Sequence, residues 1–428
     1  MASPAVDDGK LALFRNPNFT RYLAARIIAT LGVQMQSVAI GWQVYQVTGE
    51  LFDLGLIGLA QFAPFVVLVL PAGEMADRYD RKRIITACLV LQLVCSLFLL
   101  GFSFSTLAAV WPIFATLTLF GAARAFMMPA SQAILINIVP PESFGRAVAL
   151  NSSMFHMAVI VGPVFGGFLY LGGPRLVYGV VAVLLVVSIG LMLLIQSTSA
   201  PARDLAPASL ARVLEGLRFV WSRPVVLGAI SLDLFAVLLG GAVALLPAYA
   251  HDVLQADSTG LGLLRAAPGA GAALTSLALA AWPPKRGVGI WMFGGVAVFG
   301  VATVWLGQTR SLPFAMAALF LTGAGDMVSV YVRHILVQLE TPDSIRGRVS
   351  AVNAVFIGAS NELGEFESGL MAAWLGLLPA IVTGGLATIA VTLIWAWRFP
   401  SLSRMDRFPE LASEPTAAVT EAPAPGAS

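Results

Sequence analysis

The chain alternates between long apolar stretches and short polar connections. Twelve apolar stretches follow one another, with approximate bounds 20–46, 54–73, 83–104, 108–137, 145–172, 174–196, 224–250, 259–282, 287–308, 312–339, 348–374 and 376–398. Nearly all exceed the length of about 20 residues that an α-helix needs to cross the hydrocarbon layer of a bilayer. Because backbone polar groups in lipid must be satisfied internally, such stretches predict helices. The pattern therefore predicts an all-α polytopic membrane protein with twelve transmembrane helices.

The amino-acid composition is typical of an integral membrane protein. Hydrophobic residues make up 58% of the 428 residues and charged residues only 11%, whereas soluble domains carry about 25% charged residues. The net charge of +2 is too small to indicate a nucleic-acid partner. The two cysteines, Cys88 and Cys95, share one apolar stretch, so they predict neither a disulfide scaffold nor a metal site. We expect no cofactor and no metal.

Basic residues predict the orientation of the chain. Nearly all Lys and Arg outside the apolar stretches fall in connections on the side of the N-terminus, and the connections on the other side hold only Arg175 and Arg310. Since cytoplasmic loops are enriched in Lys and Arg, we expect both termini to be cytoplasmic. The charged N-terminus and the absence of a small-residue cleavage site after the first apolar stretch argue against a cleaved signal peptide.

The apolar stretches group into two halves that resemble each other. The expected segments are a cytoplasmic N-terminus (1–19), a first six-helix half (20–196), a linker (197–223), a second six-helix half (224–398) and a disordered cytoplasmic tail (399–428). A shift of 202 positions superimposes several residues of the halves: Gly121 and Gly323, Pro140 and Pro342, Arg146 and Arg348, Asn151 and Asn353, Gly162 and Gly364, Gly167 and Gly369. Two parallel six-helix halves with substrate between them are a transporter architecture.

The linker carries an amphipathic pattern. Leu210, Leu214, Leu217 and Trp221 recur at helical spacing, with charged residues mostly between them. This spacing predicts a helix lying at the membrane surface between the halves. The alternative is a plain linker without regular structure.

The connection between the second and third stretches carries a recognisable motif. Residues 73–83 read GEMADRYDRKR. The segment resembles the signature of the major facilitator superfamily in the same loop, with matches at Gly73, Asp77, Arg78, Arg81 and Lys82 and an aspartate, residue 80, in place of the usual glycine. The resemblance implies the major facilitator fold and a cytoplasmic gate in which Asp77 pairs with the other half. The alternative is a plain topology signal.

The fifth stretch holds a second motif, GPVFGG at residues 162–167. In the superfamily that it resembles, this pattern, here Gly162, Pro163, Gly166 and Gly167, is associated with antiporters that export their substrate. Glycines also let any two membrane helices approach closely. Ordinary close packing is therefore the alternative interpretation of the motif.

Charged residues inside the apolar stretches are candidates for substrate and proton binding, because charges at membrane depth are costly and usually line a transport path. Arg26 and Arg124 lie in the first half, and Asp233 and Asp326 at comparable positions of the second half. In the superfamily these four helices line the central cavity. We expect the arginines to attract an anionic or phenolic substrate and the aspartates to bind its cationic groups or a proton. Buried ion pairs that hold the halves together are the alternative.

The eleventh stretch is the most unusual, because residues 361–369 read NELGEFESG. At about 100° per residue, Glu362 and Glu365 lie about 60° apart on one face, and Glu367 lies nearly opposite. Two carboxylates on one dry face repel each other, which favours proton binding to one of them. We expect Glu362 and Glu365 to couple transport to protons and Glu367 to have a structural role.

Together with residues 140–151, this segment is most similar to the enterobactin-exporter branch of the superfamily. The resemblance implies a transporter of the bacterial inner membrane, not an enzyme, that works as a monomer. We expect a proton-coupled antiporter that exports a small amphipathic molecule such as a siderophore or drug. Two alternatives remain: an importer or facilitator on the same fold, and a non-transporting membrane receptor.

Overall fold

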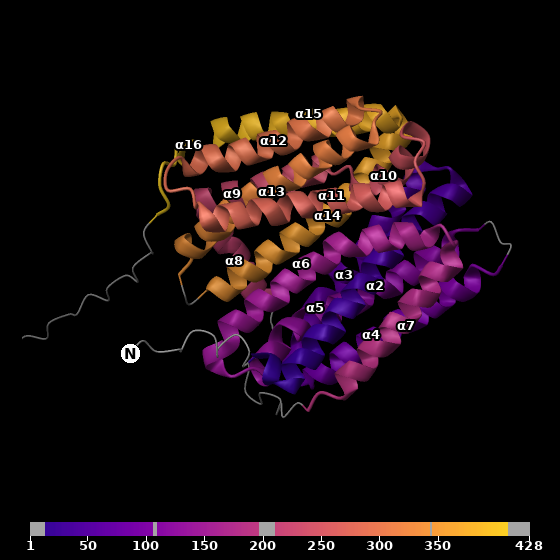
Figure 1. Cartoon of the computed structure of the whole chain (residues 1–428). Coiled ribbons are helices and arrows are strands. Elements are labelled where there is room, and N and C mark those ends of the chain that lie inside the picture. The colour runs from indigo at the N-terminus through magenta and orange to yellow at the C-terminus, as the bar shows by residue number, and fades with distance from the viewer. Residues whose placement is uncertain (1–12, 106–108, 197–209, 343–344, 410–428) are drawn as a thin grey trace, which may run out of the picture.

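The computed structural model describes residues 13–105, 109–196, 210–342 and 345–409, which form two bundles of helices packed side by side (Figure 1). The first bundle contains α2 (Pro17–Thr48), α3 (Leu51–Arg78), α4 (Arg81–Phe102), α5 (Trp111–Ile138), α6 (Phe144–Tyr170) and α7 (Pro174–Leu193). The second contains α9 (Pro224–Gly240), α11 (Ser258–Ala281), α12 (Val288–Gln308), α13 (Leu312–Glu340), α14 (Arg346–Leu375) and α15 (Leu377–Arg398).

The helices confirm the predicted all-α polytopic fold. Among the described residues, 11 segments are long and apolar enough to cross a membrane. The remaining long helix, α14, has 30 residues and is set apart by its charges, which include Glu362, Glu365 and Glu367. Its length and its position within the second bundle make it the twelfth transmembrane helix.

Local sequence explains where many helices begin and end. The side chain of Asn16 accepts hydrogen bonds from the backbone N–H groups of Asn18 and Phe19, and Pro17 occupies the first turn of α2. At the other end of α2, Gly49 adopts a left-handed conformation with φ of 67°. Such a conformation is open to glycine at little cost, so the helix stops there.

The seventh membrane segment differs from the expected continuous helix over 224–250. Helix α9 ends at Gly240, and the chain reaches the next loop through the short segments η2 (Val243–Leu245), α10 (Leu246–Ala248) and η3 (Tyr249–Val253). Two adjacent glycines favour the break, because glycine is a poor helix former. Gly241 is extended, with φ of −73° and ψ of 106°, and its carbonyl accepts a hydrogen bond from the Ser368 hydroxyl.

The start of the tail is ordered, in contrast to the expected disorder from residue 399. The short helix α16 (Pro400–Ser403) follows α15, and Leu402 is buried in a cluster at the end of the second half. The Asp406 carboxylate accepts a hydrogen bond from the Gly287 N–H at 3.0 Å, which attaches the segment to the start of α12. The expectations for residues 1–12 and 410–428 lie outside the described residues.

Equivalent glycines make equivalent contacts in the two halves. A Cβ atom on Gly162 of α6 would meet the side chain of Gln34 on α2, and one on Gly364 of α14 would meet the carbonyl of Leu238 on α9. Each of these helices therefore packs closely on the first helix of its own half, as expected for an internal repeat.

The linker contains a helix, α8 (Leu210–Ser222), that packs against the start of α14. Arg348 of α14 donates a hydrogen bond to the Glu215 carboxylate at 2.6 Å. A Cβ atom on Gly216 would lie 3.0 Å from the Arg348 carbonyl, so the two helices touch closely. Residues 197–209 of the linker lie outside the described residues.

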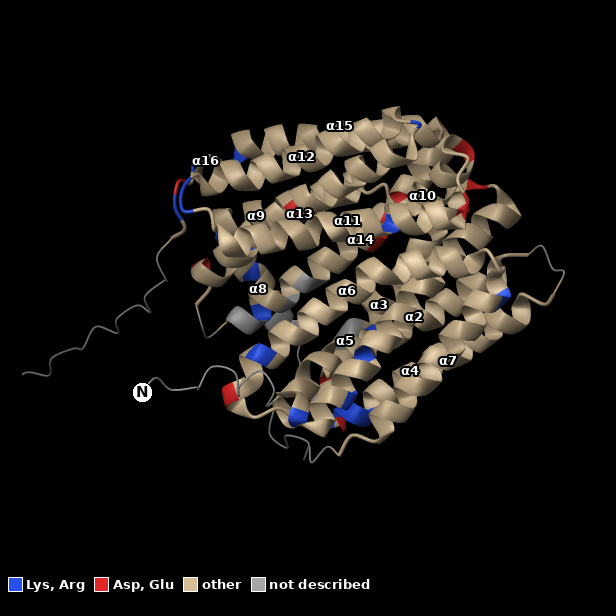
Figure 2. Cartoon of the chain, in the orientation of Figure 1, with Lys and Arg blue, Asp and Glu red and all other residues tan. Residues whose placement is uncertain are grey.

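Charge divides the molecule into two ends. Figure 2 shows most Lys and Arg gathered at the end of the bundle near the chain termini, and several acidic residues at the opposite end. We call these ends the termini side and the far side. This distribution follows the loop pattern from which the orientation was predicted.

Candidate functional site

The two halves approach most closely near the far side. A Cβ atom on Gly55 of α3 would lie 3.0 Å from the Cα of Gly369 on α14, and one on Gly167 of α6 would lie 2.2 Å from the Ser258 carbonyl of α11. Only glycine allows helix backbones to approach in this way. Two contacts, α3 with α14 and α6 with α11, therefore join the halves at this end.

Polar and aromatic groups also join the halves at the far side. The Tyr45 hydroxyl of α2 donates a hydrogen bond to the Asp252 carboxylate of the segment after α9. The neighbouring His251 ring contacts the rings of Trp42 and Tyr45 edge-on, each with centroids 5.9 Å apart. These contacts close the interface between the halves at the end of α2.

Polar side chains in the middle of two membrane helices are exposed. Arg124 lies in the middle of α5, yet 49% of its side chain is exposed. Asn361 of α14 is also exposed, although it too lies within a membrane helix. The interface between the halves is therefore accessible to solvent at the level of Arg124, whereas the contacts described for the far side close it there.

An ion pair links the halves at the bottom of this opening. Arg124 of α5 donates a hydrogen bond to the Glu362 carboxylate of α14. The Glu362 side chain is 11% exposed, so its charge is largely removed from water. The guanidinium also lies over the Phe65 ring, 5.7 Å from its centroid. The structure thus brings together two residues for which the sequence had suggested separate roles.

A second acid and a second base lie beside this pair. Glu365 is one turn further along α14 and packs against α3, where a Cβ atom on Gly58 would lie 2.7 Å from the Glu365 Cβ. Arg265 of α11 is within electrostatic range of Glu365. It donates a hydrogen bond to the Ser37 hydroxyl of α2, and its Nε has no hydrogen-bond partner among the described residues. We call Arg124, Arg265, Glu362 and Glu365 the central charge cluster.

Arg26 lies apart from the central charge cluster. It donates a hydrogen bond to the Tyr22 hydroxyl at 3.0 Å, and its guanidinium lies 5.5 Å from the centroid of the Phe155 ring on α6. It is 11 positions before Ser37 on the same helix, about 16 Å nearer to the termini side. Arg26 therefore lies nearer to the termini side than the central charge cluster does.

The two aspartates belong to a network inside the second half. Asp233 of α9 forms an ion pair with Arg333 of α13, and the two side chains are 6% and 3% exposed. Asp326, two turns before Arg333 on α13, lies within electrostatic range of both. In this state Asp233 is paired within its own half rather than open to a substrate, so its predicted binding role and that of Asp326 stay predictions.

The sequence suggested Arg265 as a counter-ion for the acidic residues of α14 but assigned no partner to Arg333. Both are arginines at membrane depth, and that rarity was the available signal. Their partners come from helices distant in sequence, since α11 meets α2 and α13 meets α9. The periodicity of one helix carries no information about which helix lies opposite, so the pairing required the structure.

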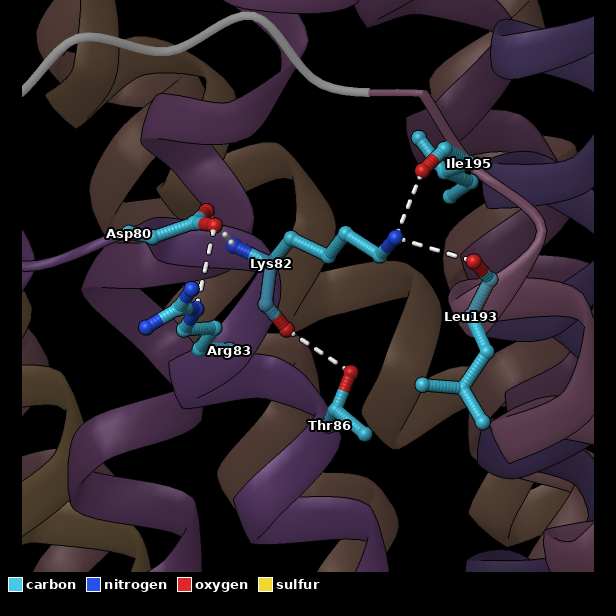
Figure 3. A network of polar contacts seen from close by, with 6 residues as sticks. All are labelled: Asp80, Lys82, Arg83, Thr86, Leu193 and Ile195. Carbon is cyan, nitrogen blue, oxygen red and sulfur yellow. Dashed lines mark hydrogen bonds and ion pairs between the residues drawn. The ribbon is translucent and has the colours of Figure 1, made fainter.

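The signature loop between α3 and α4 holds together helices of the first half (Figure 3). The Lys82 ammonium donates to the carbonyls of Leu193 and Ile195 at the end of α7, at 2.9 and 2.6 Å. Asp80 has an ordinary φ of −60° and caps α4 by accepting from the Lys82 N–H, so no glycine is required there. Arg81 bonds to carbonyls of α3 and α5.

The gate assigned to this loop stays a prediction. Arg78 pairs with Glu74 of its own helix, and Gly73 lies in α3 with open space around it. The side chain of Asp77, which would reach the other half, lies outside the described residues. What the structure describes of the loop is therefore its role in joining α3, α4, α5 and α7.

We expect Lys82→Met to lower the free energy of unfolding by about 1–2 kcal/mol, because the ammonium bonds to carbonyls at a helix C-terminus. The measurement is thermal unfolding of the purified protein in one detergent. Arg83→Met is the matched control, since the Arg83 side chain is 89% exposed and lies 3.8 Å from Asp80. Equal effects of the two substitutions would contradict a specific role for the Lys82 contacts.

The glycines of the fifth-stretch motif have distinct partners. Gly166 approaches the Met35 backbone of α2, whereas Gly167 approaches α11 of the other half. The carbonyl of Pro163 lies against Gly262 of α11, 2.5 Å from where its Cβ would be. The motif thus forms part of the closed interface between the halves, and its association with antiport stays a prediction.

Comparison with known proteins decides the family. The family model described as Major Facilitator Superfamily matches residues 22–365, most of the chain. The chain belongs to the Major Facilitator Superfamily. Its members are transporters and not enzymes, which confirms the superfamily and the non-enzymatic function expected from the motifs.

Characterised relatives of this superfamily member include exporters. It is 28% identical over 410 residues to the multidrug efflux pump Tap of Mycolicibacterium fortuitum, covering 92% of this chain and 97% of that protein. It is 26% identical over 381 residues to the enterobactin exporter EntS of Shigella boydii, covering 86% of each.

Solved structures of other transporters share the fold of this superfamily member. A bacterial homologue of the human lysosomal transporter Spinster, in an inward-facing and unoccupied conformation, superposes with a TM-score of 0.71 at 16% identity, over 91% of this chain and 97% of that chain. A D-xylose–proton symporter gives a TM-score of 0.69 at 14% identity, over 89% and 97%. The fold is thus that of a multi-pass membrane transporter for a small molecule.

Proposed function

We propose that this transporter is a proton-coupled antiporter that exports a small amphipathic molecule across the bacterial inner membrane, with both termini in the cytoplasm. The exporters among its relatives, Tap and EntS, support the direction of transport. The concentration of Lys and Arg on the termini side supports the orientation. In that orientation, the structure described above is open to the cytoplasm.

The observation that carries this proposal is the ion pair between Arg124 and Glu362, with Glu365 one turn away. The pair joins the halves across the cavity, so it must break when the halves separate. A proton on Glu362 or Glu365 removes a negative charge and weakens the hold on Arg124. Protonation of Glu362 or Glu365 and release of Arg124 are therefore coupled within the central charge cluster.

The cations of the cavity support a substrate with anionic or phenolic groups. Arg26 and Arg124 each lie near an aromatic ring, Phe155 and Phe65 respectively. An arginine beside a ring presents a charge and an apolar surface together, which suits an amphipathic molecule. The unpartnered Nε of Arg265 is a further donor for such a group. A siderophore or an acidic drug has this chemistry.

These groups define a cycle of alternating access. In the inward-open state the substrate enters from the cytoplasm and competes with Glu362 for Arg124. The halves then rock about their interface and expose the cavity to the far side. There the substrate leaves and a proton binds to the acidic pair. The protonated transporter returns to the inward-open state, where the pair releases the proton to the cytoplasm. Asp326 is a second candidate for proton binding.

The test uses reconstituted protein in liposomes with a pH gradient and a pH-sensitive dye. We expect Glu365→Gln to abolish substrate-driven proton movement while substrate counterflow continues, because the residue that releases the proton is gone and the helix packing is kept. Glu362→Gln should likewise abolish substrate-driven proton movement, and it should also weaken the ion pair with Arg124. If both variants keep counterflow and pH dependence unchanged, the coupling mechanism is wrong.

Glu367→Gln is the matched control for this experiment, since it removes a carboxylate from the opposite face of the same helix. We expect its proton coupling to equal that of the wild type. Everted membrane vesicles test the direction, because an exporter accumulates substrate in them under an inward-acidic gradient. An importer or facilitator would not, and a receptor would bind substrate without any flux.

A further inference from the structure

A second cavity lies within the second half, away from the central charge cluster. Its volume is about 190 Å³. It lies at the break after α9, between that break, α14 and α15, and Thr303 of α12 also lines it. The lining is mostly apolar, with residues such as Leu239, Leu245 and Met371. Glu367 is the one ionisable residue among those that line the cavity.

Glu367 has no hydrogen bond or ion pair with any described residue. The hydroxyls that share its cavity are already used as donors, because Ser368 donates to the Gly241 carbonyl, Thr303 to Phe299 and Thr383 to Pro379. None of the lining residues is a lysine or arginine. The part of the chain that the structure describes therefore provides this half-buried carboxylate with no partner, and an unpaired charge in an apolar site is costly.

The position of the cavity indicates how a ligand would reach it. Thr383 lies in the first turns of α15 and is exposed on the flank of the second half, and Val243 beside the break in α9 is 40% exposed. Thr383 itself lines the cavity, so the cavity reaches an exposed position on the second half. The cavity is thus accessible from the bilayer, independently of the path between the halves.

We propose that this cavity binds the ammonium group of a lipophilic cation, with Glu367 as the counter-ion and the apolar lining around the hydrocarbon part of the ligand. An ammonium supplies the hydrogen-bond donors and the positive charge that the protein withholds from Glu367. A hard metal ion fits less well, because it requires several oxygen ligands and Glu367 is a single carboxylate. The site is separate from the proposed substrate path and holds whether or not transport is coupled to protons.

The probe is an octylammonium ion that carries a diazirine on its chain, with the matching diazirine-bearing octanol as the neutral control. After illumination of the wild-type protein in liposomes at neutral pH, mass spectrometry should find the ammonium label on residues 239–245 and 380–387. We expect Glu367→Gln to reduce this labelling about tenfold, the equivalent of one charge-assisted hydrogen bond. Labelling by the neutral probe should not change.

Two further variants keep the test decisive. Glu365→Gln removes a carboxylate from the opposite face of α14 and should leave the labelling of the cavity intact. Ala387→Leu fills the cavity while keeping Glu367, and should reduce labelling by both probes. Equal ammonium labelling of the wild type and Glu367→Gln, or equal labelling of these segments by the charged and neutral probes, would overturn the proposal. Thermal unfolding of each purified variant in detergent shows that it is folded.

Discussion

Replacing Arg124 with glutamine is expected to reduce substrate transport to below about a tenth of the wild-type rate, because it leaves the buried Glu362 carboxylate without its cation. The substitution removes one positive group of the substrate cavity at the same time. The effect on transport should exceed the effect on stability, since 49% of the Arg124 side chain is exposed to the cavity. The measurement is the initial rate of substrate uptake into everted vesicles, normalised to the amount of protein.

An exchange of the two charges separates pairing from substrate binding. In the double variant Arg124→Glu with Glu362→Arg, the ion pair between the halves is restored with its polarity reversed. We expect stability to recover and transport to remain low, because the cation now projects from α14 instead of α5. Full recovery of transport by the exchanged pair would show that transport requires only the ion pair between the halves and that Arg124 does not bind the substrate.

The second large effect is expected at Arg333, whose replacement with methionine should lower the free energy of unfolding by about 3–5 kcal/mol. The reason is burial, since the side chains of Arg333 and Asp233 are 3% and 6% exposed. Without the arginine, Asp233 remains buried next to Asp326 with no cation. Thermal unfolding of the purified variant in detergent, followed by tryptophan fluorescence, measures the loss.

Two controls test this interpretation. The double variant Asp233→Asn with Arg333→Met removes both charges and should recover most of the lost stability. Arg348→Met breaks a partly exposed pair with Glu215 and should cost less than about 1 kcal/mol. If the double variant is no more stable than Arg333→Met, the loss reflects packing and not an unpaired charge.

The membrane helices were predictable because lipid imposes strict rules on the backbone. Every long apolar stretch except the seventh became a helix within a few residues of its expected ends, and glycine or a capping residue marked the boundary in cases such as α2. The seventh stretch was the exception, since its hydropathy continues through Gly240 and Gly241. Hydropathy measures the free energy of burying residues in lipid and does not report a local break in a helix. At this break the Gly241 carbonyl accepts a hydrogen bond from the Ser368 hydroxyl.

The candidate site was only partly predictable. The rarity of charges in apolar stretches identified Arg124, Glu362 and Glu365 as unusual. Helical geometry placed Glu362 and Glu365 on a different face of α14 from Glu367, which lines the cavity within the second half. The pairing of Arg124 with Glu362 spans 238 positions in the chain. Such a contact depends on how the two bundles pack against each other. The periodicity of a single helix does not encode this packing. For the same reason the sequence could not identify Arg333 as the partner with which Asp233 forms an ion pair in this structure.

The close glycine contact between α3 and α14 gives the molecule a mechanical property. Gly55 and Gly58 touch α14 near one end of α3, and the rest of the helix extends to Arg78 without a comparable contact among its described glycines. If the halves rock about this contact, as the proposed cycle requires, the remaining 20 or so residues of α3 form a lever arm of about 30 Å. A tilt of about 10° around the contact would displace the distant end by about 5 Å, taking 1.5 Å of helix length per residue. In the proposed cycle, a proton bound by Glu365 beside this contact would therefore be coupled to a movement of several ångströms at the distant end of α3.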